Sequence, residues 1–419
     1  MRPEAGDVGD VIIWPSCHES CHPVGVPRFE PFPALRYAAG HRLDDVAAPP
    51  YDVLSTADVE RLAAQHPHNI VRVDVPGPDH DPARYERAAT TLQAWERDAI
   101  LVPDTSPSFT IYRMHFTSES GQERTTVGVI GALEVVDEGA GGVLPHERTT
   151  PKATTDRLDL TRATRANLSP VWGLSLTPGL TELLVDAGEP LGSCVDEQGV
   201  IHVVERITEP GRLAAISRAV AANPVLIADG HHRYAISRAY RDERRSGDGA
   251  GPWDLVLCYV GELVESQLSI DAIHRLYGAI SSDDLDAALD GCFRRSPAGV
   301  VTPSTTAEMI ARGALCQVAA DGTGWWLEPR DGAFDGVRSL DGAWLEHALA
   351  HVPHDVTYQH GVAQVVDRVA GGELTAGVLI RPTGIAEIRR TATEGLLMPP
   401  KSTFFTPKLR TGLVVRTLG

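Results

Sequence analysis

Residues 211–262 alternate between helix and strand patterns, and this alternation limits the possible folds more than any other part of the sequence. The segment GRLAAISRAVAA (211–222) has apolar residues at helical spacing, and an Asn-Pro pair ends it. An apolar strand PVLIAD follows, Gly230 turns the chain, and HHRYAISRAYRDERR starts a second helix before the buried strand WDLVLCYVGE (253–262). This order predicts an α/β (α+β mixed) fold.

The rest of the chain divides around this core by composition. Residues 1–27 have no periodicity, so we expect a disordered N-terminal tail. The main α/β lobe is predicted to span 28–275. Between 276 and 375 the composition shifts toward acidic helices and small strands, which predicts a second, smaller α+β lobe. The apolar and basic segment 376–419 is expected to return to the main lobe.

Charge and cysteine content restrict the partners and the compartment. The 419 residues carry a formal net charge of −18, which disfavours a nucleic-acid partner. We found no uninterrupted apolar run long enough for a bilayer, and we expect a cytoplasmic protein with reduced thiols and no membrane partner. Cys17-His18 and Cys21-His22 suggest a metal site, but zinc takes four ligands and no second pair lies nearby, so we favour a loose extension.

The strongest local signal is IADGHHRYA. An apolar strand ends at Asp229, Gly230 permits a tight turn, and His231, His232 and Arg233 occupy the first turn of a helix. Helix-start amide groups, two imidazoles and a guanidinium are suited to phosphate oxygens. In the alternative, Asp229 caps the helix and the histidines bond within the loop. We predict an anion site in which Gly230, His231, His232 and Arg233 bind a phosphate-bearing cofactor.

Two carboxylates are candidates for the chemistry. Asp229 faces the anion site from the strand end, where it can hold Mg²⁺ or accept a proton. Glu147, in LPHERTT, follows a Gly-rich loop and can act as general base for a hydroxyl if the fold brings it to that site. The alternative for the second segment is a solvated loop and helix face.

A third signal is MPPKSTFFTPKLR (398–410). Lys401, Ser402 and Lys408 place ammonium and hydroxyl groups among Pro and Phe, so we expect them to contribute to binding the phosphates. An edge strand with gatekeeping lysines is the alternative. The segment is not a P-loop, because no Gly-rich turn precedes Lys401.

Four motifs together resemble the bacterial and archaeal domain of unknown function 1015 family. They are the APPYDV turn, LPHERT, IADGHHRYA and MPPKSTFFTPKLRTGL, in the expected order, and the resemblance runs from about Pro31 to the C-terminus. In APPYDV, Tyr51 and Asp52 either line a pocket or belong to a rigid turn. The family has no settled activity, so this resemblance alone implies no reaction.

The Asp-Gly-His-x-Arg turn is also similar to the phosphate-binding turn of the ParB/sulfiredoxin superfamily, which includes CTP-binding partition proteins and free-serine kinases. This resemblance implies a nucleotide-binding lobe in which Asp229, Gly230, His231 and Arg233 match the turn. It also makes Glu147 a candidate for the base that activates the substrate hydroxyl.

These observations lead to three expectations. The first is a phosphotransferase that uses ATP, ADP or another nucleotide with Mg²⁺ on a small hydroxyl metabolite, with L-serine implied by the resemblance alone. The second is a phosphatase acting on a phosphorylated metabolite such as phosphoserine. The third is a non-enzymatic, nucleotide-gated binding or regulatory protein. The sequence leaves the nucleotide, the acceptor and the oligomeric state open.

Overall fold

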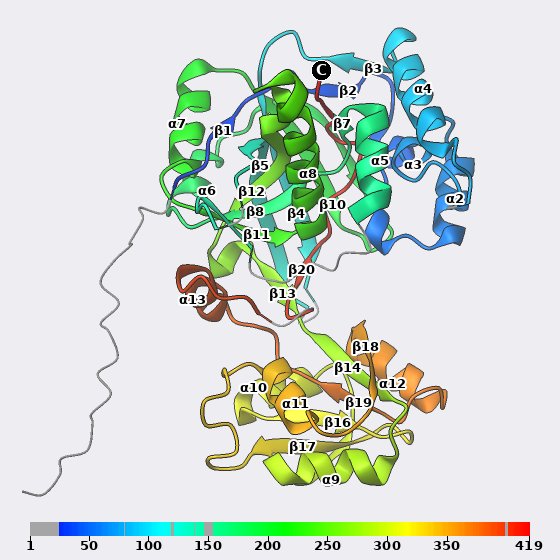
Figure 1. The fold of residues 1–419 in the computed structure, drawn as a ribbon, viewed down its shortest axis with the longest axis vertical. Coiled ribbons are helices and arrows are strands. Elements are labelled where there is room, and N and C mark those ends of the chain that lie inside the picture. Colours follow the sequence, from blue (N-terminus) through cyan, green and yellow to red (C-terminus); the bar gives the residue numbers. More distant parts are fainter. Residues whose placement is uncertain (1–24, 79, 119–120, 138, 146–153, 399–400) are drawn as a thin grey trace, which may run out of the picture.

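The computed structural model has two lobes joined by a narrow connection (Figure 1). It describes the following residues: 25–78, 80–118, 121–137, 139–145, 154–398 and 401–419. Helices and strands alternate through both lobes, so the predicted mixed α/β fold with a smaller second lobe is confirmed. Among the described residues, no helix is both long and apolar enough to cross a membrane.

A mixed sheet forms the centre of the larger lobe. Its strand order is β6-β11-β8-β12-β5-β4-β10-β9, with β1 also paired to β5. The strands are β1 (Phe29–Glu30), β4 (Phe109–Thr117), β5 (Glu123–Glu134), β6 (Val143–Pro145), β8 (Val171–Ser175), β9 (Glu189–Val195), β10 (Ile201–Ile207), β11 (Val225–Asp229) and β12 (Leu255–Glu262). The central strand β12 is buried along almost its whole length, and β5 is buried from Thr126 to Leu133, which explains the apolar runs in both strands.

Both faces of this sheet are covered. One face packs against Leu180, Ile216 and Tyr234. These residues belong to α6 (Leu180–Leu183), α7 (Pro210–Val220) and α8 (His231–Asp248). The other face packs against Ile388 and Leu413 from the last part of the chain. The C-terminal segment is therefore part of the core of the larger lobe, and its apolar residues are buried by the sheet.

A helical layer lies beside the sheet and carries the APPYDV turn. It consists of β2 (Leu35–Tyr37), α1 (Leu43–Val46), α2 (Thr56–Gln65), α3 (Val71–Asp74), α4 (Arg84–Arg97), β3 (Leu101–Pro103), α5 (Thr154–Thr164) and β7 (Ala166–Asn167), the last paired with β21 (Arg416–Thr417). Its core joins Leu62, Leu92 and Trp95 to Leu160 and Val415. This packing fixes the turn before α2 against the rest of the lobe.

The smaller lobe is built on an antiparallel sheet of order β15-β17-β16-β19-β14-β18. Its elements are β14 (Ile273–Gly278), α9 (Ser282–Cys292), β15 (Phe293–Val300), α10 (Thr305–Arg312), β16 (Leu315–Val318), β17 (Thr323–Pro329), α11 (Asp341–Ala348), β18 (Asp355–His360), α12 (Val362–Ala370) and β19 (Ala376–Leu379). Separate apolar clusters cover its two faces. Each lobe therefore has its own core.

A short two-stranded ribbon lies where the lobes meet (Figure 1). Its strands are β13 (Ser269–Asp271) and β20 (Phe404–Thr406), which pair in antiparallel fashion, and α13 (Ile385–Thr393) lies close to it in sequence. On the second-lobe side, the Arg275 guanidinium donates to the Lys401 carbonyl at 3.1 Å. The ribbon brings the MPPKSTFFTPKLR segment to the junction of the lobes.

Candidate functional site

The turn between β11 and α8 is the predicted anion-binding turn. Asp229 is the last residue of β11, and α8 begins at His231. Gly230 between them has φ of +84°, a left-handed conformation that glycine adopts at little cost. A Cβ at this position would also lie 3.2 Å from the Arg233 guanidinium carbon, so the turn needs glycine for two reasons.

Asp229 is held between two cations. Its Oδ2 accepts a hydrogen bond from Arg233 at 2.7 Å, and its Oδ1 accepts one from the Lys408 ammonium at 2.8 Å. Burial raises the pKa of this carboxyl, but the positive charges of Lys408, Arg233 and His231 lower it by more, so the net shift of the pKa is downward. Asp229 is therefore ionised and a weak proton acceptor. Two neighbouring cations also disfavour the Mg²⁺ that the sequence predicts at this carboxylate.

Arg233 points into the protein from the first turn of α8. Its side chain is 9% exposed, and one guanidinium nitrogen donates to the carbonyl of Pro170. The same group lies 3.6 Å from an Asp52 carboxylate oxygen. Burial lowers its pKa, but Asp52 and Asp229 outweigh that effect and raise it above the ordinary value. Arg233 thus links the anion-binding turn to the APPYDV turn.

A cluster of charges surrounds this link. The guanidinium of Arg157 stacks over the Tyr51 ring at 3.8 Å and lies 3.2 Å from a carboxylate oxygen of buried Asp74. Burial raises the pKa of Asp74, and the nearby Arg157 and Arg233 lower it only in part. Sequence analysis did not single out Arg157 or Asp74, because neither residue lies in a motif that indicates their proximity.

A cavity of about 440 Å³ opens next to Lys408. Both lobes contribute to it: its wall contains Pro50 from the APPYDV turn, Arg410 from the C-terminal segment and His360 from β18 of the smaller lobe. The Phe404 ring stacks on His360 at a centroid distance of 4.6 Å, and the Lys408 ammonium lies 4.2 Å from that ring centroid. The Lys408 side chain therefore joins Asp229 to the cavity.

The cavity also contains a carboxylate that sequence analysis missed. Asp271 lines it from β13 and accepts a hydrogen bond from the Thr406 hydroxyl at 3.0 Å. Burial raises the pKa of Asp271, and Thr406, His360 and Lys408 lower it only in part. A carboxyl group with a raised pKa on a cavity wall is suited to proton transfer. No motif surrounds Asp271 in the sequence, and its place depends on the β13–β20 pairing.

The remaining predicted residues lie in different surroundings. His231 and His232 are half-buried at the start of α8. Lys401 is exposed with φ of +59°, and Ser402 is buried, with its carbonyl accepting from Thr383 at 2.9 Å. Glu147 lies outside the described residues. The structure thus brings Asp229, Arg233 and Lys408 into direct contact, and places Lys401 and Ser402 at the junction of the lobes.

Comparisons with solved structures give distant similarities. A free serine kinase in complex with AMP has a TM-score of 0.35 and 12% identity, covering 63% of this chain and 83% of that chain. A conserved hypothetical protein from Pyrococcus furiosus has a TM-score of 0.34 and 12% identity, with coverage of 63% and 87%. SbnI with a C-terminal truncation, from Staphylococcus aureus, has a TM-score of 0.36 and 11% identity, with coverage of 67% and 84%.

Sequence comparisons establish the family. No curated protein matches the sequence. A family model described as "Protein of unknown function (DUF1015)" matches residues 29–343, which include the APPYDV and IADGHHRYA motifs. The resemblance inferred from the motifs is confirmed, and the chain belongs to this family.

Proposed function

We propose that the protein transfers a phosphoryl group from a nucleotide to a small hydroxyl metabolite. The observation that carries this proposal is the contact of Asp229 with both Arg233 and Lys408 at the start of α8, beside a cavity of about 440 Å³. Phosphoryl transfer depends mainly on positioned positive charge and on helix-start amide groups. The cavity volume falls within the ordinary range for small-molecule sites.

In this proposal the turn binds the nucleotide phosphates. Gly230, His231 and His232 present the helix start, and Arg233 and Lys408 supply charge. Asp229 positions both cations, because its carboxylate accepts a hydrogen bond from each. The proposed phosphate-bearing ligand is ATP or ADP, and a Mg²⁺ ion bound to those phosphates needs no protein ligand at Asp229. Lys401 and Ser402 are proposed to contact the same ligand from the lobe junction.

Two carboxylates are proposed as alternatives for the base. Glu147 keeps the role expected from its loop, and Asp271 is supported by its position on the cavity wall and its raised pKa. The base that acts on the hydroxyl should contribute about 10²–10⁴-fold to turnover. Replacing the base by its amide, as Glu147→Gln or Asp271→Asn, should therefore reduce turnover by that factor while nucleotide binding is retained.

A transfer assay tests the proposal. The purified protein is incubated with Mg²⁺, ATP or ADP and a panel of small hydroxyl compounds, beginning with L-serine because of the resemblance of the turn to that of free-serine kinases. Phosphorus NMR identifies the product, and chromatography measures consumption of the nucleotide. We expect an acceptor-dependent phosphate ester, and its absence with every acceptor would contradict the proposal.

The same assay separates the other two functions. A phosphatase would release phosphate from phosphoserine or a similar ester without any nucleotide. A nucleotide-gated binding protein would bind the nucleotide and form neither product. Arg218→Gln, at an exposed arginine on α7, is a matched control that should leave each activity unchanged.

A further inference from the structure

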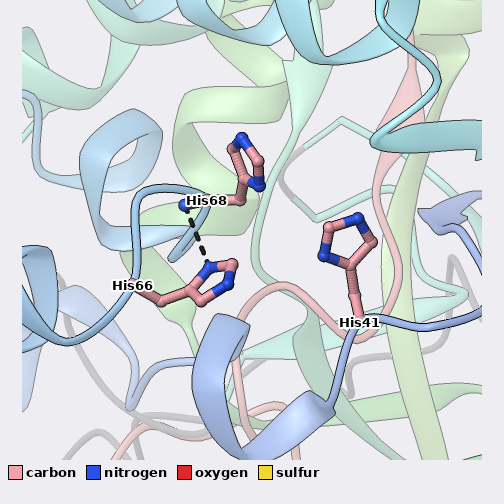
Figure 2. A group of neighbouring side chains, drawn as sticks. All are labelled: His41, His66 and His68. Atoms are coloured by element: carbon pink, nitrogen blue, oxygen red, sulfur yellow. Dashed lines mark hydrogen bonds between the residues drawn. The ribbon is translucent and has the colours of Figure 1, made fainter.

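Three histidines from two separate loops meet in the helical layer of the larger lobe. His41 lies between β2 and α1, and His66 and His68 lie between α2 and α3. Each offers one ring nitrogen, and these three nitrogens all lie within 4.8 Å of one another. Figure 2 shows the three imidazole rings around one shared space. None of the three lines the cavity beside Lys408, so the cluster is independent of the function proposed above.

The surroundings hold this cluster in place. The Tyr37 hydroxyl donates to the His68 carbonyl at 2.7 Å, and the His68 ring packs edge-on against Trp95 at 5.7 Å. Nδ1 of His68 is buried and has no hydrogen-bond partner within the described part of the chain. A buried polar atom without a partner is costly, and a ligand at this position would remove that cost.

The spacing of the three ring nitrogens suits a metal ion. Zinc binds imidazole at about 2.0–2.1 Å in tetrahedral geometry, so its ligand nitrogens lie about 3.4 Å apart. Nitrogens within 4.8 Å reach that spacing through modest ring movements.

One hydrogen bond has to change when a metal binds. Nδ1 of His66 accepts a hydrogen bond from the His68 backbone amide at 3.1 Å (Figure 2), so a neutral His66 ring carries its proton at Nε2. Coordination through Nδ1 exchanges this hydrogen bond for a metal–nitrogen bond. Coordination through Nε2 requires the ring proton to move to Nδ1, which also breaks this hydrogen bond.

We propose that His41, His66 and His68 bind a divalent transition metal of the zinc class, with the fourth coordination position open to water or an added ligand. Three histidine ligands with one open position are typical of reactive rather than purely structural zinc sites. The ion would also cross-link the loop before α1 to the loop after α2. The site would then take part in the stability of the helical layer that carries the APPYDV turn.

Cobalt and zinc titrations of the metal-free full chain test this proposal. Tetrahedral Co²⁺ gives strong visible absorption, and Zn²⁺ should displace it at one equivalent per chain. His66→Asn and His41→Asn should each weaken binding by more than about 100-fold, because losing an outer-shell partner alone costs about 10–100-fold. His351→Asn, at an exposed histidine of the smaller lobe, should leave the titration unchanged.

A second control separates this cluster from the N-terminal cysteines. In a Cys17→Ser/Cys21→Ser double variant we expect the same cobalt spectrum, without a thiolate-to-metal band in either protein. Far-UV circular dichroism of the metal-free His66→Asn and His41→Asn variants checks that both are folded. The proposal is overturned if the wild type binds no metal, if both folded histidine variants bind it normally, or if binding is lost only in the cysteine variant.

Discussion

Lys408 and Asp229 lie 179 positions apart in the sequence, and their contact defines the candidate site. The Lys408 side chain is 19% exposed, so it is shielded from solvent while it still reaches the cavity. An ion pair with this much burial is screened less by salt than a surface pair. The ammonium group is thus held in place on the wall of the cavity.

At the residue scale, His274 should make stability depend on pH. Its Nδ1 accepts a hydrogen bond from the Ile380 backbone amide at 3.2 Å. Burial, aided by the nearby Arg275 and His360, lowers the pKa of His274 to about 3. The folded protein therefore takes up a proton here less readily than the unfolded chain, whose histidine pKa is about 6.5. The contribution of His274 to the free energy of unfolding is fully present above the unfolded-state pKa of about 6.5. It is lost as the pH falls toward 3, by about 1.4 kcal/mol per pH unit.

Urea unfolding at several pH values between about pH 6 and pH 4, below the ordinary histidine pKa, measures how the free energy of unfolding changes. His274→Gln removes the titrating ring, so its free energy of unfolding should vary less with pH than that of the wild type. His351→Asn, at an exposed position, serves as the control. Parallel pH curves for His274→Gln and the wild type would show that His274 is not the titrating group.

At the element scale, glycines in the central strand β5 should be sensitive to substitution. A Cβ at Gly131 would lie 2.5 Å from Phe29 and 2.6 Å from Phe109, whose rings stack beside the strand. Gly131→Ala should therefore destabilise the protein by about 1–3 kcal/mol through overpacking. Gly247→Ala, in helix α8 with no atom within 4 Å of the added Cβ, should instead stabilise it by up to about 1 kcal/mol. Denaturant unfolding of both variants tests this contrast, and equal stabilities would contradict it.

Elements formed from local sequence were the ones that could be predicted. The strand, glycine turn and helix around Gly230 follow from apolar periodicity and one residue with positive φ, so sequence analysis found Asp229 and Arg233. Asp271 was missed because its relation to the cavity depends on β13 pairing with a strand more than 130 residues later. Long-range pairing of this kind leaves no local pattern.

At the scale of the whole molecule, the C-terminal segment completes the larger lobe. Val415 and Leu35 exchange backbone hydrogen bonds of 2.9 and 3.0 Å, and Val415 is fully buried. Three further apolar side chains after Arg410 are buried: Leu413, Val414 and Leu418. Each contributes about 1.5–3 kcal/mol when buried, against a total stability of about 5–15 kcal/mol for a typical domain.

A chain that ends at Arg410 should therefore lose the cooperative thermal transition of its larger lobe. Removal of the exposed Gly419 alone is the matched control and should leave the melting temperature unchanged. Calorimetry of the two truncated chains makes the comparison. A normal transition in the shorter chain would show that the larger lobe folds without the final strand β21.

Nucleotide binding at the junction of the two lobes is the central claim, and a thermal-shift titration with Lys408→Gln tests it most directly. A ligand at about 100 times its Kd stabilises a protein by about 2.7 kcal/mol, which gives a clear rise in melting temperature. With Mg²⁺ and ATP, ADP, CTP or GTP, we predict that at least one nucleotide stabilises the wild type and Arg218→Gln but has little effect on Lys408→Gln. If no nucleotide stabilises the wild type, or if Lys408→Gln responds equally, the site does not bind nucleotide phosphates and the proposed function is wrong.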